Sequence, residues 1–208
     1  MGQVLTLDTL LRDARVWRGQ GQAPAPSRQP TGWTALDAAL PTQGWPEASL
    51  TEILMTSDGI GELALLMPTL ARLSSAGKPI VVIAPPYRPY APAWQHAGIA
   101  LLHLHVVDAS GREALWAMEQ VLRAGCAGAV LAWPVQADDQ ALRRLQVAAE
   151  TGQTLGFAFR NGKCAGNPSP APLRLVMTTT AGGSQLRVLK CRGGLAPSAP
   201  VPFPSPLH

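Results

Sequence analysis

The sequence predicts an α/β fold with a mainly parallel sheet, flanked by helices and closed by a C-terminal β-hairpin. Short apolar runs typical of buried strands alternate with helical segments, and this alternation is typical of right-handed βαβ crossovers. The last two extended segments, residues 173–179 and 185–191, flank Ala181-Gly182-Gly183, a composition that favours a tight turn. Of the 208 residues, 47% are hydrophobic and 14% are charged, which allows one domain with a substantial core.

An apolar helix is expected at the start of the chain, over residues 1–18. Val4, Leu7 and Leu11 lie there at helical spacing. Residues 19–30 are rich in Gly, Pro, Gln and Ser, which is the composition of a linker. A helix on such a linker either docks onto the body of its own chain or binds another protein, and the sequence leaves both open.

The body of the protein is expected to span residues 31–194 as one domain. Strands are expected at residues 49–55, 80–84, 103–107, 127–133 and 155–160, and helical periodicity covers residues 63–73, 115–122 and 138–151. Gly77 and Gly125 follow the first two helices, and an Asp pair begins the third, where the helix dipole favours acidic residues. Prolines recur after residue 194, so residues 195–208 are expected to form a disordered or polyproline-like tail.

The loop after the first strand is the place where a domain of this type would bind a phosphate group. Its candidate residues are Ser57, Asp58, Gly59, Gly61 and Glu62. A nucleotide loop needs a Lys for the phosphates, followed by a Ser or Thr hydroxyl for magnesium. Glu62 and Leu63 stand at those two positions, and a carboxylate repels a triphosphate. The loop is therefore interpreted as a degenerate nucleotide site.

The later strands also lack the acidic residues that nucleotide hydrolysis requires. The strand at residues 127–133 ends in Trp133-Pro134 instead of an Asp. Pro85-Pro86 follow the strand at residues 80–84, which leaves no carboxylate there to position water. We therefore predict no enzymatic activity, no cofactor and no small-molecule substrate. An NTPase with an unusual loop is the alternative, and tight ATP binding would reveal it.

Cysteine and histidine spacing argues against a disulfide framework and a zinc site. Cys126, Cys164 and Cys191 are odd in number and form no CxxC pair. His103 and His105 alternate along a strand without a set of carboxylate and cysteine ligands, so no metal is predicted. No apolar run approaches the ~18 residues that a membrane span needs, and no signal peptide is recognisable. We expect a cytoplasmic protein that does not bind membranes.

Charge is distributed unevenly along the chain. Residues 1–150 carry 11 basic and 13 acidic side chains, a net charge of −2, whereas residues 151–208 carry six basic and no acidic ones. The six are Arg160, Lys163, Arg174, Arg187, Lys190 and Arg192. Such a segment suits a phosphate backbone or an acidic partner; alternatively, it only keeps a proline-rich, apolar region in solution. Strand alternation is expected to place Arg187 on the face opposite Lys190 and Arg192.

Two segments at the start of the body resemble RecA. Residues 31–40, TGWTALDAAL, and residues 44–53, GWPEASLTEI, are similar to the stretch in which G-x-x-x-L-D precedes the phosphate-binding strand. With Gly98-Ile99 and the stretches 155–160 and 186–194, they make residues 31–194 resemble the ImuA family. Its members are RecA-like and SulA-like proteins encoded beside error-prone polymerases in bacteria. The resemblance implies a degenerate RecA-like domain and a role in translesion DNA synthesis during the SOS response.

The resemblance also implies partners. These are an ImuB-type inactive Y-family polymerase homologue and an error-prone DnaE-type polymerase, with RecA and DNA as further candidates and nucleoid association during activity. In RecA the loop corresponding to residues 161–170 faces DNA, so Arg160 and Lys163 are the first candidates for such a contact. The alternative relative is SulA, which inhibits cell division by binding FtsZ. The basic closing hairpin favours ImuA, because SulA-like chains tend to be shorter there.

Overall fold

The protein folds around one mixed sheet of eight strands, in the order β3-β2-β4-β5-β1-β6-β7-β8. The computed structural model describes residues 25–135, 137–180 and 183–203. The strands are β1 (Leu50–Met55), β2 (Ile80–Ile83), β3 (Leu104–Val107), β4 (Ala129–Ala132), β5 (Leu155–Asn161), β6 (Leu173–Thr180), β7 (Gly183–Cys191) and β8 (Val201–Phe203). The strands from β3 to β6 pair in parallel, and β7 and β8 are added antiparallel.

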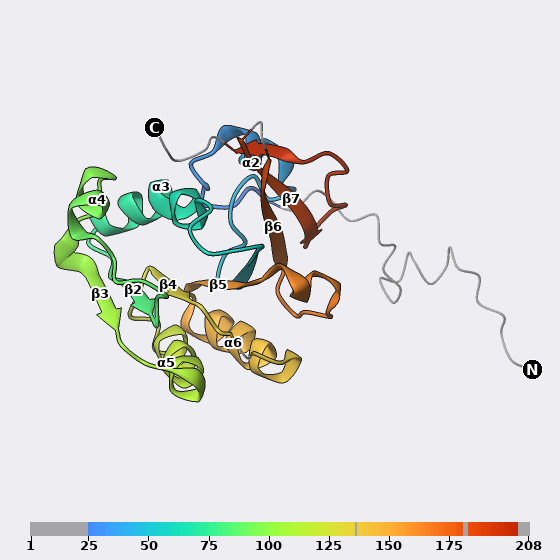
Figure 1. Ribbon diagram of the computed structural model, residues 1–208. Helices are drawn as coiled ribbons and strands as arrows, with labels where there is room; N and C mark the ends of the chain where they lie inside the picture. Colours follow the sequence, from blue (N-terminus) through green and yellow to red (C-terminus); the bar gives the residue numbers. More distant parts are fainter. Residues whose placement is uncertain (1–24, 136, 181–182, 204–208) are drawn as a thin grey trace, which may run out of the picture.

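Helices cover both faces of this sheet. They are α2 (Thr34–Ala39), α3 (Glu62–Ser75), α4 (Ala91–His96), α5 (Gly111–Ala124) and α6 (Asp139–Gly152), with short 3₁₀ helices η1 (Leu101–His103) and η2 (Gly162–Gly166). Figure 1 shows α3 and α4 on one face and α5 and α6 on the other. The prediction of an α/β fold with a mainly parallel, helix-flanked sheet and a closing hairpin is confirmed, whereas a RecA-like arrangement stays a prediction.

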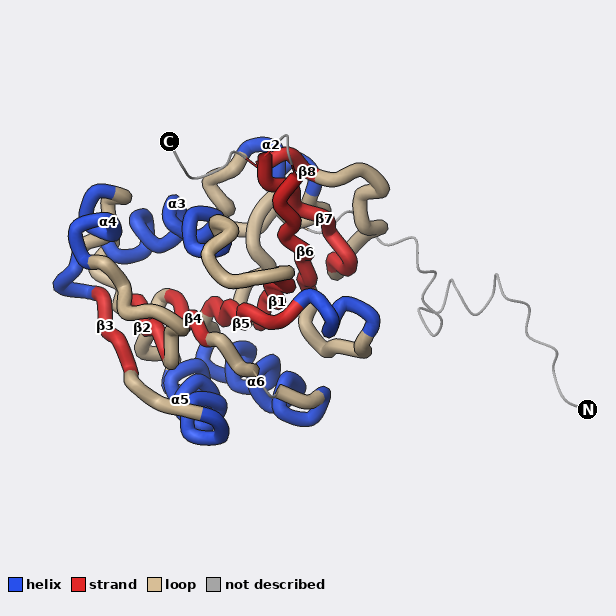
Figure 2. Tube along the Cα trace, viewed as in Figure 1, coloured by secondary structure: helices blue, strands red, loops and turns tan. Residues whose placement is uncertain are grey.

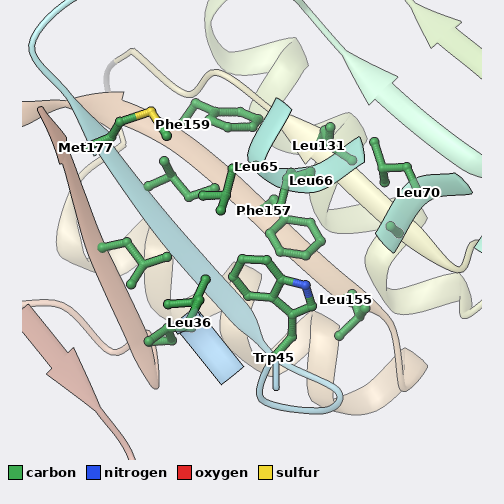
Figure 3. Packing of buried hydrophobic residues seen from close by; sticks show 14 of the residues in the cluster. Leu36, Trp45, Leu65, Leu66, Leu70, Leu131, Leu155, Phe157, Phe159 and Met177 are labelled. Atoms are coloured by element: carbon green, nitrogen blue, oxygen red, sulfur yellow. The ribbon is translucent and has the colours of Figure 1, made fainter. Parts of the chain in front are cut away.

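Two apolar layers hold the helices against the sheet. The central strands are buried along their whole length, as expected for strands with helices on both faces. In the first layer, Leu65 and Leu66 of α3 lie over Phe157 and Trp45 (Figure 3), whose rings meet edge to face at 5.1 Å. In the second layer, α5 and α6 bury residues such as Leu122. Because β1, β2, β4 and β5 run parallel between these layers, their carboxyl ends lie along one edge of the sheet.

The helix boundaries follow local sequence signals. Asp138 caps α6, because its side chain accepts a hydrogen bond from the Ala141 N–H at 2.7 Å, and Gly125 ends α5 with φ of 66°. No helix was predicted at α4, because Pro85, Pro86 and Pro89 precede it and such a composition is typical of a loop. Pro92 lies in the first turn of α4, where a missing N–H breaks no helical hydrogen bond.

The tail prediction is wrong for residues 201–203, which form β8 (Figure 2). Val201 and Phe203 are buried, and the Phe203 ring meets Trp33 edge to face at 4.7 Å. Pro202 is accommodated because β8 is the edge strand of the sheet, where one side of the backbone needs no partner. The apolar residues on either side of Pro202 therefore outweighed the proline content.

The beginning of the chain was predicted as a helix and a linker. The helix at residues 1–18 lies outside the described residues. Of the linker, residues 25–30 are described, and they run along the body: the Ser27 N–H donates to the Thr42 carbonyl at 2.7 Å, and the Trp45 N–H donates to the Gln29 carbonyl at 2.8 Å. Within the described part of the chain, no helix is long and apolar enough to cross a membrane.

Candidate functional site

The loop between β1 and α3 lies at the carboxyl edge of the sheet, and its anion position is filled by the protein itself. The Glu62 side chain turns back, and its Oε1 accepts a hydrogen bond from the Gly59 N–H at 3.0 Å. Glu62 is only 5% exposed. Gly61 precedes the helix with φ of 101°, a conformation that glycine adopts without strain. Of the five predicted loop residues, Gly59 and Glu62 are joined by this hydrogen bond and Gly61 lies between them, whereas Ser57 and Asp58 are exposed.

This carboxylate uses a backbone donor that a phosphate in the loop would need. A phosphate entering the loop would compete with Glu62 for the same backbone donor, beside a second carboxylate on the exposed Asp58. Leu63 packs against the apolar layer beneath α3 and offers no hydroxyl. The positive end of the α3 dipole could attract an anionic ligand, but here the Glu62 carboxylate of the protein itself lies in the first turn.

An aromatic stack stands where an acid would follow β4. The Trp133 ring is stacked on Phe159 with centroids 4.5 Å apart and an angle of 22°. Trp133 is buried, and its Nε1 has no hydrogen-bond partner among the described residues. The stack therefore places aromatic rings at the carboxyl ends of β4 and β5.

A groove opens beside this stack, between the loop after β2 and the first turns of α3. It has a volume of about 300 Å³ and is floored by Trp94, Trp133 and Val82. Tyr87 and Tyr90 form part of its rim and are 74% and 70% exposed. Exposed aromatic side chains at the rim of an apolar groove are typical of protein-binding surfaces.

This groove was not predicted, although its residues are visible in the sequence. The run Pro85-Pro86-Tyr87-Arg88-Pro89-Tyr90, which follows the strand expected at residues 80–84, combines two signals. The prolines stiffen the backbone, and the tyrosines between them cannot all be buried in so short a segment. A second cavity of about 240 Å³ adjoins the groove, with Pro86 and Trp133 lining both.

Two of the basic candidates, Arg160 and Arg174, are structural. Arg160 Nη1 donates to Glu52 Oε1, and Arg174 Nε donates to Glu52 Oε2, each at 2.6 Å. Glu52 is fully buried, and the two arginines are 7% and 6% exposed. Both guanidiniums neutralise and anchor an internal carboxylate, so neither side chain lies at the surface, where the predicted contact with DNA or a partner would be made.

Arg174 also holds the turn after β5 in place. Its guanidinium donates to the carbonyl oxygens of Cys164, Ala165 and Asn167 in and beside η2, at 2.9 to 3.3 Å. Lys163 lies in the same turn and is exposed. The loop predicted to face DNA is thus a turn built around a buried arginine, and Lys163 is its exposed cation.

The remaining basic candidates, Arg187, Lys190 and Arg192, are exposed. The expectation that Arg187 lies opposite Lys190 and Arg192 is wrong, because the register of β6 and β7 contains a bulge. Arg174 pairs with Lys190, but Leu175 pairs with Val188, so that Leu189 is the extra residue. Arg187 pairs with Val176, two residues from Arg174, and this brings Arg187 to the face of Lys190.

Among the described residues, no group of three His, Cys, Asp or Glu side chains lies close enough to hold a metal ion.

Comparisons with known proteins give one family. The family model described as cell division inhibitor SulA matches residues 49–156. Among solved structures, the chain is similar to SulA from Pseudomonas aeruginosa, with 28% identity and a TM-score of 0.46, over 56% of this chain and all of that one. No curated protein matches the sequence. The family match contains the loop with Glu62, the groove and Trp133, and it ends before η2 and the β6–β7 hairpin.

Proposed function

The chain belongs to the SulA family of cell division inhibitors, and from this premise we propose that it is a non-enzymatic SOS-response protein that inhibits division by binding FtsZ. The observation that carries the non-enzymatic part is the Glu62 carboxylate, which occupies the anion position of the loop. Because a phosphate would have to displace this carboxylate, we expect the protein to act by binding a partner protein and not by hydrolysing a nucleotide.

The groove beside Trp133 is the surface that we propose for this contact. It lies inside the matched residues, and its rim carries Tyr87 and Tyr90, whose side chains are largely exposed. Tyrosine loses little conformational entropy on binding and buries a large area, and for this reason it is frequent among residues that dominate binding energy.

Sedimentation of FtsZ polymers and their GTP hydrolysis test this proposal. Wild-type protein is expected to reduce both, and Tyr87→Ala combined with Tyr90→Ala is expected to weaken the effect about tenfold or more. Trp116→Ala is the matched control, because Trp116 is an aromatic residue on α5 that is 65% exposed, on the other face of the sheet. No effect of wild-type protein on FtsZ would overturn the proposed function.

A second candidate function is an accessory role in translesion synthesis, with an ImuB-type polymerase homologue as partner. The part of the chain beyond the family match favours this role. It contains the folded strands β6, β7 and β8, and it carries basic residues but no acidic residue. A pull-down with purified FtsZ and ImuB homologue in one tube separates the two. Retention of the ImuB homologue alone would replace the division-inhibitor proposal.

A further inference from the structure

The outer face of the β6–β7 hairpin carries cations that the proposed contact with FtsZ does not use. The bulge at Leu189 turns Arg187 to the same side as Lys190, and Arg192 follows Lys190 by two residues. We call Arg187, Lys190 and Arg192 the basic hairpin face. Lys163 extends it, because η2 lies over Arg174 on the same side of the sheet.

The charge beneath this face is also positive. One carboxylate, that of Glu52, is shared by the guanidiniums of Arg160 and Arg174, which leaves one buried positive charge uncompensated. The pKa of Lys190 is lowered, first by desolvation and then by the charges of Arg174 and Arg192. Cations are thus crowded here against their mutual repulsion, and a bound anion would relieve that repulsion.

The type of anion follows from what surrounds the face. Single-stranded nucleic acid is bound by stacking bases on exposed aromatic rings, but the described aromatic residues after residue 150 (Phe157, Phe159 and Phe203) are all buried. A long duplex would extend beyond the hairpin over the rest of the chain, where residues 1–150 carry a net charge of −2. A short anionic segment meets only the positive area.

We propose that the basic hairpin face binds an extended, acidic segment of a partner protein. The Asp or Glu side chains of that segment would approach Arg187 and Lys190 of β7 and Arg192, which directly follows the strand. The site is on residues outside the family match and away from the groove, so it does not depend on the proposed contact with FtsZ.

Fluorescence anisotropy of a labelled oligoglutamate peptide, titrated with the full chain, tests this proposal. Binding is expected to weaken with added salt. Arg187→Glu combined with Lys190→Glu is expected to lower the affinity about tenfold or more, since the reversed charges repel the peptide. The control, Arg112→Glu combined with Arg143→Glu, makes the same change in net charge on α5 and α6 and is expected to leave the affinity within about twofold.

Two outcomes would overturn the proposal. Equal losses in the two double variants would mean that only the net charge matters. Tighter binding of a DNA duplex of equal charge, lost in the same hairpin variant, would assign the face to nucleic acid. Lys190 Nζ donates to the Ser169 carbonyl at 2.8 Å, so its replacement disturbs one contact of the fold. Arg187→Glu alone, at an exposed position, keeps the test decisive if the double variant does not fold.

Discussion

Glu52 and Arg174 stand directly opposite each other in the parallel register of β1 and β6, and their side chains meet at 2.6 Å in the interior. Arg160, from β5 on the other side of β1, reaches the second oxygen of the same carboxylate. The three side chains therefore tie together the strands on both sides of β1. Because Glu52 is fully buried, its carboxylate depends on these two guanidiniums for its counter-charge.

Glu52→Gln keeps the shape of the side chain but leaves two buried guanidiniums without a counter-charge. We expect it to lower the free energy of unfolding by about 3–5 kcal/mol, measured by urea denaturation. The matched control is Glu119→Gln, because Glu119 also contacts two arginines, Arg123 at 2.7 Å and Arg144 at 3.3 Å, but near the surface. Its effect is expected to be about 0–1 kcal/mol. Equal effects of the two variants would contradict the importance of burial.

The buried ion pairs also show where sequence reasoning stops. Short apolar runs and helical periodicity predicted the order of strands and helices, because the burial of each element can be inferred from its own residues. Whether Arg160 and Arg174 face solvent depends on Glu52, which is 108 and 122 residues away in the chain. The sequence shows a charge but not its partner, and so both arginines were mistaken for surface residues.

Short elements and local irregularities were hidden for a related reason. β8 has three residues and contains a proline, so its periodicity is too brief to outweigh its composition. The bulge at Leu189 inverts the face of every residue beyond it, and a shift of one position leaves no mark on the pattern of apolar residues. The Glu62 substitution, in contrast, was visible because a motif requires one residue type at one place.

The occupied loop predicts how the protein responds to anions. Wild-type protein is expected to show no saturable binding of a fluorescent ATP analogue with magnesium in the micromolar range. Glu62 accepts the hydrogen bond of the Gly59 N–H, and the loop between β1 and α3 contains no Lys. Glu62→Ala frees the Gly59 N–H. Phosphate is therefore expected to raise the Tm of this variant, but not that of wild type, relative to chloride at equal ionic strength. Saturable micromolar binding to wild-type protein would overturn the closed-site interpretation.

Phe203 of β8 packs on Trp33 near the beginning of the domain, so its removal is expected to lower the stability of the whole domain. Phe203→Ala removes a buried ring that packs on Trp33, and we expect a loss of about 2–4 kcal/mol in the free energy of unfolding by urea denaturation. Leu195→Ala, in the preceding loop, changes a side chain that is 95% exposed and is expected to have an effect within about 0.5 kcal/mol. A neutral Phe203→Ala would mean that β8 does not stabilise the domain.

The cysteines should differ in reactivity. Cys126 is exposed, whereas burial raises the pKa of the Cys191 thiol, whose Sγ also donates to the Gly194 carbonyl at 3.7 Å. The thiolate is the reactive form, and a raised pKa means that it forms only at higher pH. Iodoacetamide at neutral pH, followed by mass spectrometry of peptides, is therefore expected to modify Cys126 before Cys191.

Raising the pH is expected to speed the modification of Cys191, because its thiolate then forms. Cys126→Ser is the control: it removes the fast phase and leaves the rate at Cys191 unchanged, as expected if the two thiols react independently. Modification of Cys191 first at neutral pH would mean that the segment after β7 opens readily, exposing the thiol that the fold covers.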